Sequence, residues 1–562
     1  MPNIAIANNI TLCLTLILAV LSLFLYFRKN DSLQSIDYEV KNDIVFYSLL
    51  SVFAIAAVLI RVYKFGQIPG GFNFDEAMSA VDAKAVAEYG TDRLGMKLPV
   101  YFQAWERGQM SAFQNYLMSV FINFAGGRLT PFICRLPMLL MSITGMVFFV
   151  LLMKDIFGKK AALFAALLVS VNPWHIVQSR WALDCNMLAH VFIIATYFLC
   201  KGQNKKHFLY ISSAVYAISM YCYGPSIYTV PIFLLAVYIC LLIQKKVTLK
   251  ETLISAGIYL LISMPYILCI FINMFKLKTI ETPLFTIPFF SKTTRAQDML
   301  FFSQAPLEQL IKNGKRVLDI LFFQKDDLLF NSVPGFGIAY VFSVPLTIIG
   351  LVQIFKSNFR GKEVILSGFF IGIFCGLMTA DSTIYRLNIM YYFVLFVQVC
   401  GIILISRKIK FSALLTSCIY IFMFILFVTS YFGKYATDIQ RYFFWDFGNA
   451  LNYVETFEAD KYYITAESQF RESKDVSEIY TLFYHEIDSA YFRGETNVLN
   501  GKEQNSYKDK YIYKNITPED INPEESAVYL VTSAQKEFFD ENLYNFKDFF
   551  GVQTNYCVVT KK

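Results

Sequence analysis

The chain has 562 residues, of which 56% are hydrophobic, 17% aromatic and 17% charged, and its formal net charge is +7. Soluble domains carry about 45–50% apolar and about 25% charged residues, so this composition excludes a soluble protein and predicts a polytopic membrane protein. The positive charge does not predict nucleic-acid binding, because the basic residues lie in short loops between apolar runs.

Apolar runs of roughly 18–22 residues are long enough to cross a hydrocarbon core about 30 Å thick, and they predict about twelve transmembrane helices. The first run precedes any Lys or Arg, which a cleaved signal peptide would carry, so we expect it to be retained as a helix. We expect the spans at 10–27, 44–63, 132–153, 160–176, 182–200, 208–223, 225–243, 252–274, 336–355, 364–379, 384–405 and 411–432.

Loop charges predict how these spans are oriented. The short loops on one side contain a single basic residue, Arg180. Each of the alternate loops contains several Lys or Arg residues. Because basic short loops stay in the cytoplasm, we expect the loops 64–131 and 275–335, both termini and the tail to lie outside the plasma membrane. The basic loops are 28–43, 154–160, 201–207, 244–250, 356–363 and 406–410.

The first outer loop places Asp75 and Glu76 side by side just after an apolar span. One interpretation is a helix start, in which Asp75 is the N-cap, Glu76 suits the first turn and Gly90 ends the helix. The other interpretation is chemical. Apolar residues along 75–89 suit a helix on the membrane surface, where partial desolvation raises the pKa of a carboxylate and makes it a better general base.

Two further outer segments carry candidate cations. Arg180 and Asp184 are four residues apart in the turn 171–187, so they would either form an ion pair on one helix face or lie together beside a lipid headgroup. Arg386 lies near the outer end of a span. It would either snorkel to the interface or bind a lipid phosphate with two donors.

Aromatic and polar residues also precede an amphipathic helix in 101–119. Trp105 and Arg107 belong to this group, and a Trp ring suits a sugar face and a membrane interface equally well. His175 and His190 lie in or beside spans, and we interpret both as structural. The 11 Cys form no CxxC or Cys–His spacing, so neither a disulfide framework nor a zinc site is predicted.

The tail from residue 434 onward is polar and alternates helical with strand patterns, which predicts a small α/β domain. Helices are expected at 447–457 and 476–486, and strands at 461–467, 526–535 and 556–561. The chain would thus divide into an extra amino-terminal transmembrane helix with its loop, a transmembrane domain with long outer loops, and an outer domain. Their bounds are 1–43, 44–433 and 434–562.

Several segments in this order resemble the GT-C glycosyltransferases of family 39, a superfamily that includes protein O-mannosyltransferases and lipid A aminoarabinose transferases. The first of these segments is the outer loop that carries Asp-Glu before a surface helix. The resemblance covers roughly residues 44–432. The other similar segments are CRLPMLLMSITGMVFFVLLMKDIFGKKAALFAALLVSVNPWHIVQSRWALD, AISMYCYGPSIYTVPIFLL and YRLNIMYYFVLFVQVCGIIL, together with SEIYTLFYHEIDSAYF in the tail.

The resemblance implies a GT-C fold and an inverting transfer of a hexose or pentose from a polyprenyl-phosphate donor on the outer face. The acceptor would be an envelope glycan, lipid or protein, and nucleic acid is not expected as a partner. Asp75 would be the catalytic base, with Glu76 supporting it. Arg180, Arg386 and Arg107 would bind the donor phosphate, with Asp184 and Trp105 in support. Several family members work without a metal, so we expect no cofactor, although the sequence leaves a divalent metal open.

Two other functions stay open from the sequence. A transporter or flippase of lipid-linked sugars would carry charged residues near the middle of its spans, whereas these spans are nearly free of charge at their centres. A catalytically silent relative that scaffolds envelope assembly would tolerate replacement of both Asp75 and Arg386. The glycosyltransferase is the leading hypothesis.

Overall fold

The computed structural model describes residues 2–28, 42–105, 109–291, 299–300, 303–326, 328–467, 473–496, 498–499, 502–503, 506–550 and 554–562. The chain forms two compact units, each built from segments distant in sequence. We call the first the membrane unit, Met1–Tyr63, Met138–Met274 and Thr293–Gly433. The second is the loop–tail unit, Lys64–Pro137, Phe275–Lys292 and Lys434–Lys562. The tail therefore joins the first outer loop in one unit, which the predicted boundary at 434 did not anticipate.

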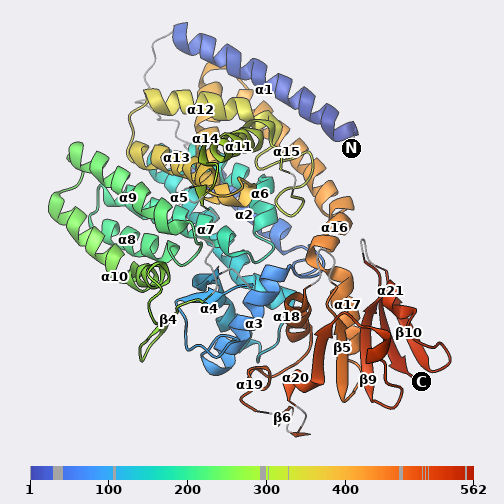
Figure 1. The fold of residues 1–562 in the computed structure, drawn as a ribbon. Coiled ribbons are helices and arrows are strands. Elements are labelled where there is room, and N and C mark those ends of the chain that lie inside the picture. The colour runs from blue at the N-terminus through green and yellow to red at the C-terminus, as the bar shows by residue number, and fades with distance from the viewer. Residues whose placement is uncertain are drawn as a thin grey trace. The chain divides into compact units, whose positions relative to one another are not determined.

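Among the described residues, eight helices are long and apolar enough to cross a membrane (Figure 1). This finding confirms a multi-pass membrane protein. The eight are α1 (Pro2–Arg28), α2 (Asp43–Val62), α5 (Pro131–Val171), α7 (Asp184–Gly202), α9 (Ser226–Ile243), α10 (Leu249–Met274), η5 (Ile384–Met390) continued by α14 (Tyr391–Lys408), and α15 (Ser412–Tyr431).

The remaining expected spans are present in other forms. The span 132–153 and most of the span 160–176 lie in α5, whose helical path is interrupted at Gly158 (φ 82°, ψ −173°) inside the predicted loop. Three more expected spans are shorter helices of 13, 13 and 17 residues. These are α8 (His207–Ser219), α12 (Val344–Lys356) and α13 (Lys362–Met378).

Burial separates central from peripheral helices in the membrane unit. The apolar segment of η5 and α14 is 94% buried, whereas that of α2 is only 11% buried. A helix that is apolar on all sides is expected in a core or in lipid, so α14 is the central helix and α2 presents its side chains to lipid. The extra helix α1 packs along α12 and η4 (Val341–Ser343), and Thr15 Oγ1 donates to the Phe342 carbonyl at 2.8 Å.

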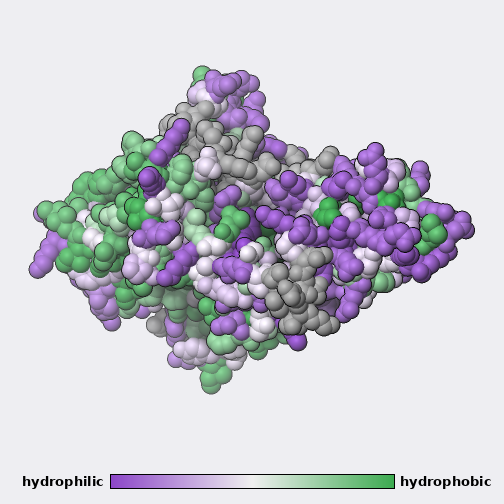
Figure 2. Space-filling model, turned by 60° about the horizontal axis from the view of Figure 1, so that its bottom comes forward, coloured by the Kyte–Doolittle hydropathy of each residue, from purple (hydrophilic) through white to green (hydrophobic). Residues whose placement is uncertain are grey.

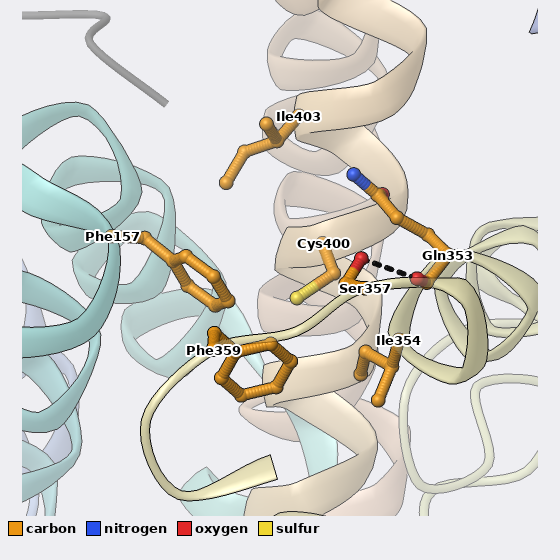
Figure 3. A pocket seen from close by; sticks show the side chains of 7 residues that line it. All are labelled: Phe157, Gln353, Ile354, Ser357, Phe359, Cys400 and Ile403. Carbon is orange, nitrogen blue, oxygen red and sulfur yellow. Dashed lines mark hydrogen bonds between the residues drawn. The ribbon is translucent and has the colours of Figure 1, made fainter. Parts of the chain in front are cut away.

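A small pocket lies between α5, α12 and α14 (Figure 3). It is lined mainly by apolar side chains, and the rings of Phe157 and Phe359 lie on one side of it near Cys400. Its lining comes from the predicted cytoplasmic loops and the helix ends beside them and includes none of the predicted site residues, so it is not the candidate site. The lining residues are Phe157, Gln353, Ile354, Ser357, Phe359, Cys400 and Ile403.

In the loop–tail unit, five of the described tail strands form one mixed sheet in the order β10-β11-β9-β5-β8. β5 is parallel to β8 and β9, whereas β11 is antiparallel to β9 and β10. The predicted strands at 461–467, 526–535 and 556–561 are confirmed, and β8 and β10 were not predicted. The bounds are β5 (Lys461–Thr465), β8 (Tyr511–Lys514), β9 (Ala527–Thr532), β10 (Tyr544–Phe549) and β11 (Tyr556–Lys561).

The two faces of this sheet are both covered. Register aligns Tyr463 with Tyr529 and Tyr529 with Val559, and these side chains form a core with Phe539 and Tyr544. The predicted helices are confirmed as α17 (Trp445–Val454) and α18 (Lys474–Tyr484), which pack on the sheet. Other short elements of the tail are α16 (Lys434–Asp438), η6 (Gln440–Phe443), α19 (Ser489–Phe492), β6 (Val498–Leu499), β7 (Lys502–Glu503), α20 (Tyr507–Lys510), η7 (Pro518–Asp520) and α21 (Ser533–Lys536).

The first outer loop contributes helix α3 (Phe74–Tyr89) to the same unit. Its residues from Glu76 to Ala85 are buried, and it packs against α4 (Ala112–Phe124) and α18. The expectation that α3 lies on the membrane surface is therefore wrong, because protein covers its apolar side chains. The same loop also contains β1 (Tyr101–Gln103) and β2 (Gln109–Ser111), and the second outer loop contributes β3 (Ile280–Glu281) and β4 (Thr286–Ile287) to this unit.

The surface carries both hydrophobic and hydrophilic residues. Figure 2 shows hydrophobic residues gathered on one side of the view and hydrophilic residues on the other. Exposed apolar side chains are numerous on the membrane helices, where Ile44 is 77% and Leu261 77% exposed. Apolar surface of this kind is expected to face lipid.

Candidate active site

Asp75 lies in the first turn of α3, and its position is set by two neighbours. Asn73, not Asp75, is the N-cap: its side chain accepts a hydrogen bond from the Asp75 N–H at 3.0 Å. The carboxylate of Asp75 is half-buried, and its Oδ1 accepts a hydrogen bond from Trp105 Nε1 at 2.7 Å. The predicted helix and its end at Gly90 are confirmed, but the cap lies two residues earlier than expected.

Glu76 is fully buried, and its carboxylate holds the backbone around Asp75. Oε2 accepts from the Asn73 N–H at 3.0 Å, which completes a capping box with the Asn73 side chain. Arg135 donates to both carboxylate oxygens at 2.9 Å and is itself fully buried. The predicted catalytic part of Glu76 is thereby corrected to a positioning part, because its carboxylate is inside the protein and paired.

The same arginine fastens the loop that leads into α3. Arg135 donates to the carbonyl oxygens of Pro69 at 2.8 Å and Gly71 at 2.9 Å. The tail completes this attachment, because Tyr480 donates to the Phe72 carbonyl and the Phe72 N–H donates to the Phe443 carbonyl, both at 2.6 Å. The backbone before Asp75 is therefore held by two distant parts of the sequence.

Trp105 links the aromatic group of the first loop to Asp75. Besides its hydrogen bond to Asp75, its ring packs against Phe74, with centroids 5.6 Å apart. Arg107, the third predicted phosphate ligand, lies outside the described residues. Arg107 therefore stays a prediction.

Arg180 belongs to the membrane unit and caps a helix end. Its guanidinium donates to the carbonyl oxygens of Ile60, Arg61 and Tyr63 at 2.7–3.1 Å. These carbonyls lie at the carboxyl end of α2, where a cation also complements the helix dipole. Arg180 is fully buried. We therefore assign it a structural part and remove it from the donor-phosphate group.

The interpretation that Arg180 and Asp184 form an ion pair on one helix face is also wrong. The short helix α6 (Pro173–Gln178) ends before Arg180, and α7 begins at Asp184, so the two residues do not share a helix. The side chain of Asp184 is half-buried, and its Oδ1 accepts a hydrogen bond from the Cys185 N–H at 2.7 Å. Asp184 thus lies in the first turn of α7, at the start of a span.

Arg386 lies in η5 and is brought to the start of α7 by packing. Asn388 donates to the Cys185 carbonyl at 3.1 Å, which joins η5 to the residue after Asp184. Arg386 Nη1 donates to the Tyr223 hydroxyl, and its guanidinium lies 5.0 Å from the centre of the Tyr385 ring. Its Nε is buried and has no hydrogen-bond partner among the described residues.

His175 and His190 belong to a buried hydrogen-bonded chain. Arg61 can only donate, so its 2.9 Å bond makes His175 Nδ1 the acceptor and puts the proton on Nε2. That Nε2 then donates to Tyr392 at 2.7 Å, and Tyr392 donates to His190 Nδ1 at 3.0 Å. The chain gives both histidines a structural place, as predicted. No cluster of His, Cys, Asp and Glu fit for a metal occurs among the described residues.

Sequence reasoning missed Arg135, Tyr480 and Tyr223. Arg135 offered a signal, because an arginine at the beginning of an apolar run is costly unless it is paired. The two tyrosines offered none, since Tyr is common in this chain, with 36 copies. The candidate groups thus fall in both units: Asp75, Glu76 and Trp105 in the loop–tail unit, and Asp184, Arg386 and Tyr223 in the membrane unit.

Comparison with known proteins adds to this geometry. Residues 111–270 match the family model described as dolichyl-phosphate-mannose-protein mannosyltransferase. None of the curated proteins matches the chain.

Among solved structures, the fold is similar to ArnT from Cupriavidus metallidurans, both bound to undecaprenyl phosphate and in the apo state. The TM-score is 0.54 in both cases, with 11% and 12% identity, and each match covers 92% of this chain and 97% of ArnT. AglB from Archaeoglobus fulgidus, an archaeal oligosaccharyltransferase in complex with an inhibitory peptide and a dolichol-phosphate, matches with a TM-score of 0.45 and 11% identity. That match covers 78% of this chain and 64% of AglB. The family match and the ArnT-like fold confirm the resemblance to GT-C glycosyltransferases.

Proposed function

We propose that this chain, a multi-pass membrane glycosyltransferase with the GT-C fold, transfers a sugar from a polyprenyl-phosphate donor to an acceptor on the outer face. The observation that carries the proposal is the half-buried carboxylate of Asp75, which Trp105 orients at the first turn of α3. The undecaprenyl phosphate bound to ArnT supports a donor of the polyprenyl-phosphate class. The acceptor is an envelope glycan, lipid or protein.

Asp75 is the general base of the proposed reaction. Its carboxylate takes the proton of the acceptor hydroxyl as that oxygen attacks the anomeric carbon of the sugar. The bond between the anomeric carbon and the phosphate oxygen breaks, and its electron pair leaves with the polyprenyl phosphate. Attack from the face opposite the phosphate inverts the anomeric centre. Asp75 then returns its proton to water.

Arg386 is the proposed ligand of the departing phosphate. Negative charge grows on the phosphate as its bond to the sugar breaks, and a fixed cation lowers the energy of that state. The Nε–H of Arg386 lacks a partner among the described residues, so a phosphate oxygen would satisfy it. Tyr223 holds the other end of the guanidinium through Nη1. No step of the proposal requires a metal or another cofactor.

Glu76 and Arg135 take a positioning part in this proposal. Their paired side chains hold the backbone from Pro69 to Asn73, which fixes where α3 begins and therefore where Asp75 projects. A base must lie within hydrogen-bond reach of the proton it takes. The rigid entry to α3 supports that requirement.

The outer face is proposed from loop charge. The basic loops 154–160 and 356–363 are expected in the cytoplasm. Loop 64–131, which carries Asp75, and the tail would then both be extracytoplasmic, where a lipid-linked sugar is presented to envelope acceptors. Protease accessibility of loop 64–131 in oriented vesicles measures this side directly.

A transfer assay tests the function. Purified protein in vesicles is given radiolabelled sugars on polyprenyl phosphate together with an envelope extract, and products are analysed for glycosidic linkage and anomeric configuration. The proposal predicts a new glycoside of inverted configuration. Movement of the labelled lipid across the vesicle without any glycoside would overturn it in favour of a transporter. Mass spectrometry of envelope glycans from cells with and without the chain would identify the sugar and acceptor.

A further inference from the structure

Two hydrogen-bonded chains inside the membrane unit end on the same helix, α7. Each chain begins at a group that can only donate, the guanidinium of Arg61 in one and the indole N–H of Trp174 in the other. The direction of every later bond follows from that first donor. The first donor therefore determines whether the polar atom at the far end of each chain donates or accepts.

The first chain ends at His190. Arg61 donates to His175 Nδ1, so His175 Nε2 carries the proton and donates to Tyr392. Tyr392 in turn donates to His190 Nδ1 at 3.0 Å, which puts the proton of this imidazole on Nε2. That Nε2 is buried and has no hydrogen-bond partner in the part of the chain that the structure describes. The first chain therefore ends in an N–H that lacks an acceptor there.

The second chain ends at Asn186. Trp174 Nε1 donates to Asn388 Oδ1 at 3.0 Å, so the amide nitrogen of Asn388 is free to donate elsewhere. That nitrogen donates to Asn186 Oδ1 at 2.9 Å. The amide nitrogen of Asn186 is buried and lacks a partner among the described residues. The second chain thus also ends in a donor.

The two donors lie on one face of α7. Asn186 and His190 are four residues apart, which places their side chains one turn apart on the same side of the helix. Both side chains are fully buried. A buried donor without an acceptor is costly, so this face of α7 needs an acceptor that the described side chains do not supply.

Gly145 of α5 provides the space for the last bond of the first chain. A Cβ at this position would lie 2.6 Å from the Tyr392 hydroxyl oxygen and 3.0 Å from His190 Nδ1. A side chain there would push Tyr392 and His190 apart. The orientation of His190 is therefore set by the packing of three helices, α5, α7 and α14.

A buried cation stands at the head of the first chain. Arg61 is fully buried, and none of its described partners is a carboxylate. Hydrogen bonds in a chain polarise one another, so the charge of Arg61 makes His190 Nε2–H a stronger donor. The partners of Arg61 are the carbonyl oxygens of Ala57, Val169 and Ser170 and His175 Nδ1.

Arg386 brings a third donor toward the pair. It lies two residues before Asn388 in η5, which packs against α7. Its Nε is buried and, like the two donors on α7, has no partner among the described residues. Three N–H groups from neighbouring elements therefore lack an acceptor.

Two acids lie near these elements, but neither supplies that acceptor. Asp184 is two residues before Asn186 and so projects about 160° away from it around α7. Asp326 accepts from the Ile384 N–H at the start of η5 and from the side chain of Asn331. Neither carboxylate bonds to one of the three donors.

The chemistry of the missing partner follows from the donors. A water molecule or a sugar hydroxyl accepts hydrogen bonds but also brings protons that need acceptors of their own. An ionised phosphate oxygen only accepts, and it forms stronger bonds because it is charged. Three donors beside the charges of Arg61 and Arg386 match a phosphate.

We propose that Asn186 Nδ2 and His190 Nε2 bind oxygen atoms of the lipid donor's phosphate, beside Arg386. The two N–H groups would hold the phosphate in place and stabilise the charge that grows on it as the sugar leaves. This inference rests on the proposed function, because it names further ligands of the same phosphate.

Dephasing of histidine ¹⁵N signals by ³¹P in solid-state NMR tests the contact without requiring turnover. The chain has only 4 histidines, so each signal can be assigned. Protein labelled with [¹⁵N]histidine is reconstituted in vesicles of galactolipid, which contains no phosphate. Undecaprenyl phosphate, inorganic phosphate and undecaprenol are added in separate samples. His207 and His485, which lie outside both chains, serve as internal controls.

The proposal predicts dephasing of His190 Nε2 by undecaprenyl phosphate and none of the two control histidines. Dephasing by inorganic phosphate as well would show that the site accepts the phosphate without its lipid, whereas dephasing by the lipid alone would identify the lipid phosphate as the ligand. Undecaprenol should have no effect. A His190 signal without dephasing in any sample, with an Nε2 proton that exchanges with water, would assign the donors to an internal water and overturn the proposal.

Binding measurements on variants give a second test. Asn186→Leu and His190→Phe should each raise the Kd for radiolabelled undecaprenyl phosphate about tenfold or more, because each removes a hydrogen bond to a charged group. His190→Gln keeps an N–H near the position of Nε2 and should recover part of the affinity. Thr196→Val, a buried change of similar size farther along α7, is the matched control and should leave the Kd unchanged.

The two levels of the account fail in different ways. If undecaprenyl phosphate binds the unmodified chain but does not dephase His190, and the Kd is unchanged in Asn186→Leu and His190→Phe, the two ligands are wrong and the proposed donor class stands. If neither undecaprenyl phosphate nor inorganic phosphate binds the unmodified chain, the site and the proposed donor class are both wrong.

Discussion

Trp105 Nε1 donates a 2.7 Å hydrogen bond to Oδ1 of Asp75, and this bond joins the end of the β1 segment to the first turn of α3. A hydrogen bond to a charged carboxylate is stronger than one between neutral groups and fixes the direction of the carboxylate plane. Because Asp75 is half-buried, the bond leaves the side chain oriented yet accessible. Orientation of this kind is what a general base requires.

Replacing Trp105 with Phe should lower kcat and leave the KM for the donor nearly unchanged. Phe keeps the ring packing on Phe74 but removes the N–H, and a hydrogen bond to a charged group contributes about 1.5–3 kcal/mol, which corresponds to about 10–100-fold in rate if it is fully used. Steady-state transfer assays measure both constants. A large rise in KM with unchanged kcat would instead place Trp105 in donor binding.

Glu76→Gln should destabilise the loop–tail unit rather than remove catalysis selectively. Breaking a buried ion pair by neutralising one partner costs about 3–5 kcal/mol, because the other charge is left unpaired. Arg135 would be that charge. Thermal unfolding in detergent should show a lower Tm, and the double variant Glu76→Gln, Arg135→Gln should recover part of it. A variant with an unchanged Tm and no turnover would make Glu76 catalytic after all.

Gly71→Ala should destabilise the chain far more than Gly90→Ala, although both glycines have positive φ, at 82° and 67°. A Cβ at position 71 would lie 2.1 Å from the Phe443 carbonyl oxygen, whereas position 90 has nothing within 4 Å. Gly90→Ala should therefore cost only about 1–2 kcal/mol for the left-handed backbone. Thermal melts of the two variants compare them directly, and equal losses would contradict the close contact.

Stability of α3 should fall as the pH rises from about 4 to about 7, through Asp82. The pKa of Asp82 is raised from its ordinary 3.8 to about 7, because the effect of burial, which raises it, exceeds the effect of the Arg93 guanidinium at 2.5 Å, which lowers it. The folded chain thus holds a proton that the unfolded chain has lost, so this contribution is full below pH 4 and is lost as pH passes 7. Hydrogen exchange of α3, corrected for intrinsic rates, measures the effect. Asp82→Asn should flatten the profile; an unchanged profile would refute the assignment.

Much of the membrane part could be predicted from sequence, because span length and hydrophobicity depend on each segment alone. The strand and helix patterns of the tail were likewise local, and β5, β9 and β11 followed from them. The shorter α8, α12 and α13 show the limit of this approach: apolar runs continue past the helix ends into turns, which hydropathy does not register.

The parts of the site that depend on distant contacts were not predictable. Glu76 meets Arg135 59 residues away, and the Phe72 carbonyl meets Tyr480 408 residues away. No local pattern encodes such partners. Arg180 was predicted to bind the donor phosphate for a related reason, because a cation in an outer turn suits a phosphate. In the structure its guanidinium instead donates to carbonyl oxygens at the carboxyl end of α2, a distant contact that the local sequence does not encode. For Asp75, sequence indicated the right helix start but not Asn73 as its cap.

The rate of a single round of sugar transfer by the Asp75→Asn variant tests the central claim most directly. Excess protein in vesicles is mixed with labelled donor and acceptor, with Glu88→Gln, a carboxylate change at the far end of α3, as the matched control. A positioned general base contributes about 10²–10⁴-fold, so the account predicts a loss of that size for Asp75→Asn with donor binding retained, and a nearly normal rate for Glu88→Gln. A folded Asp75→Asn variant that transfers sugar at the unmodified rate would contradict it.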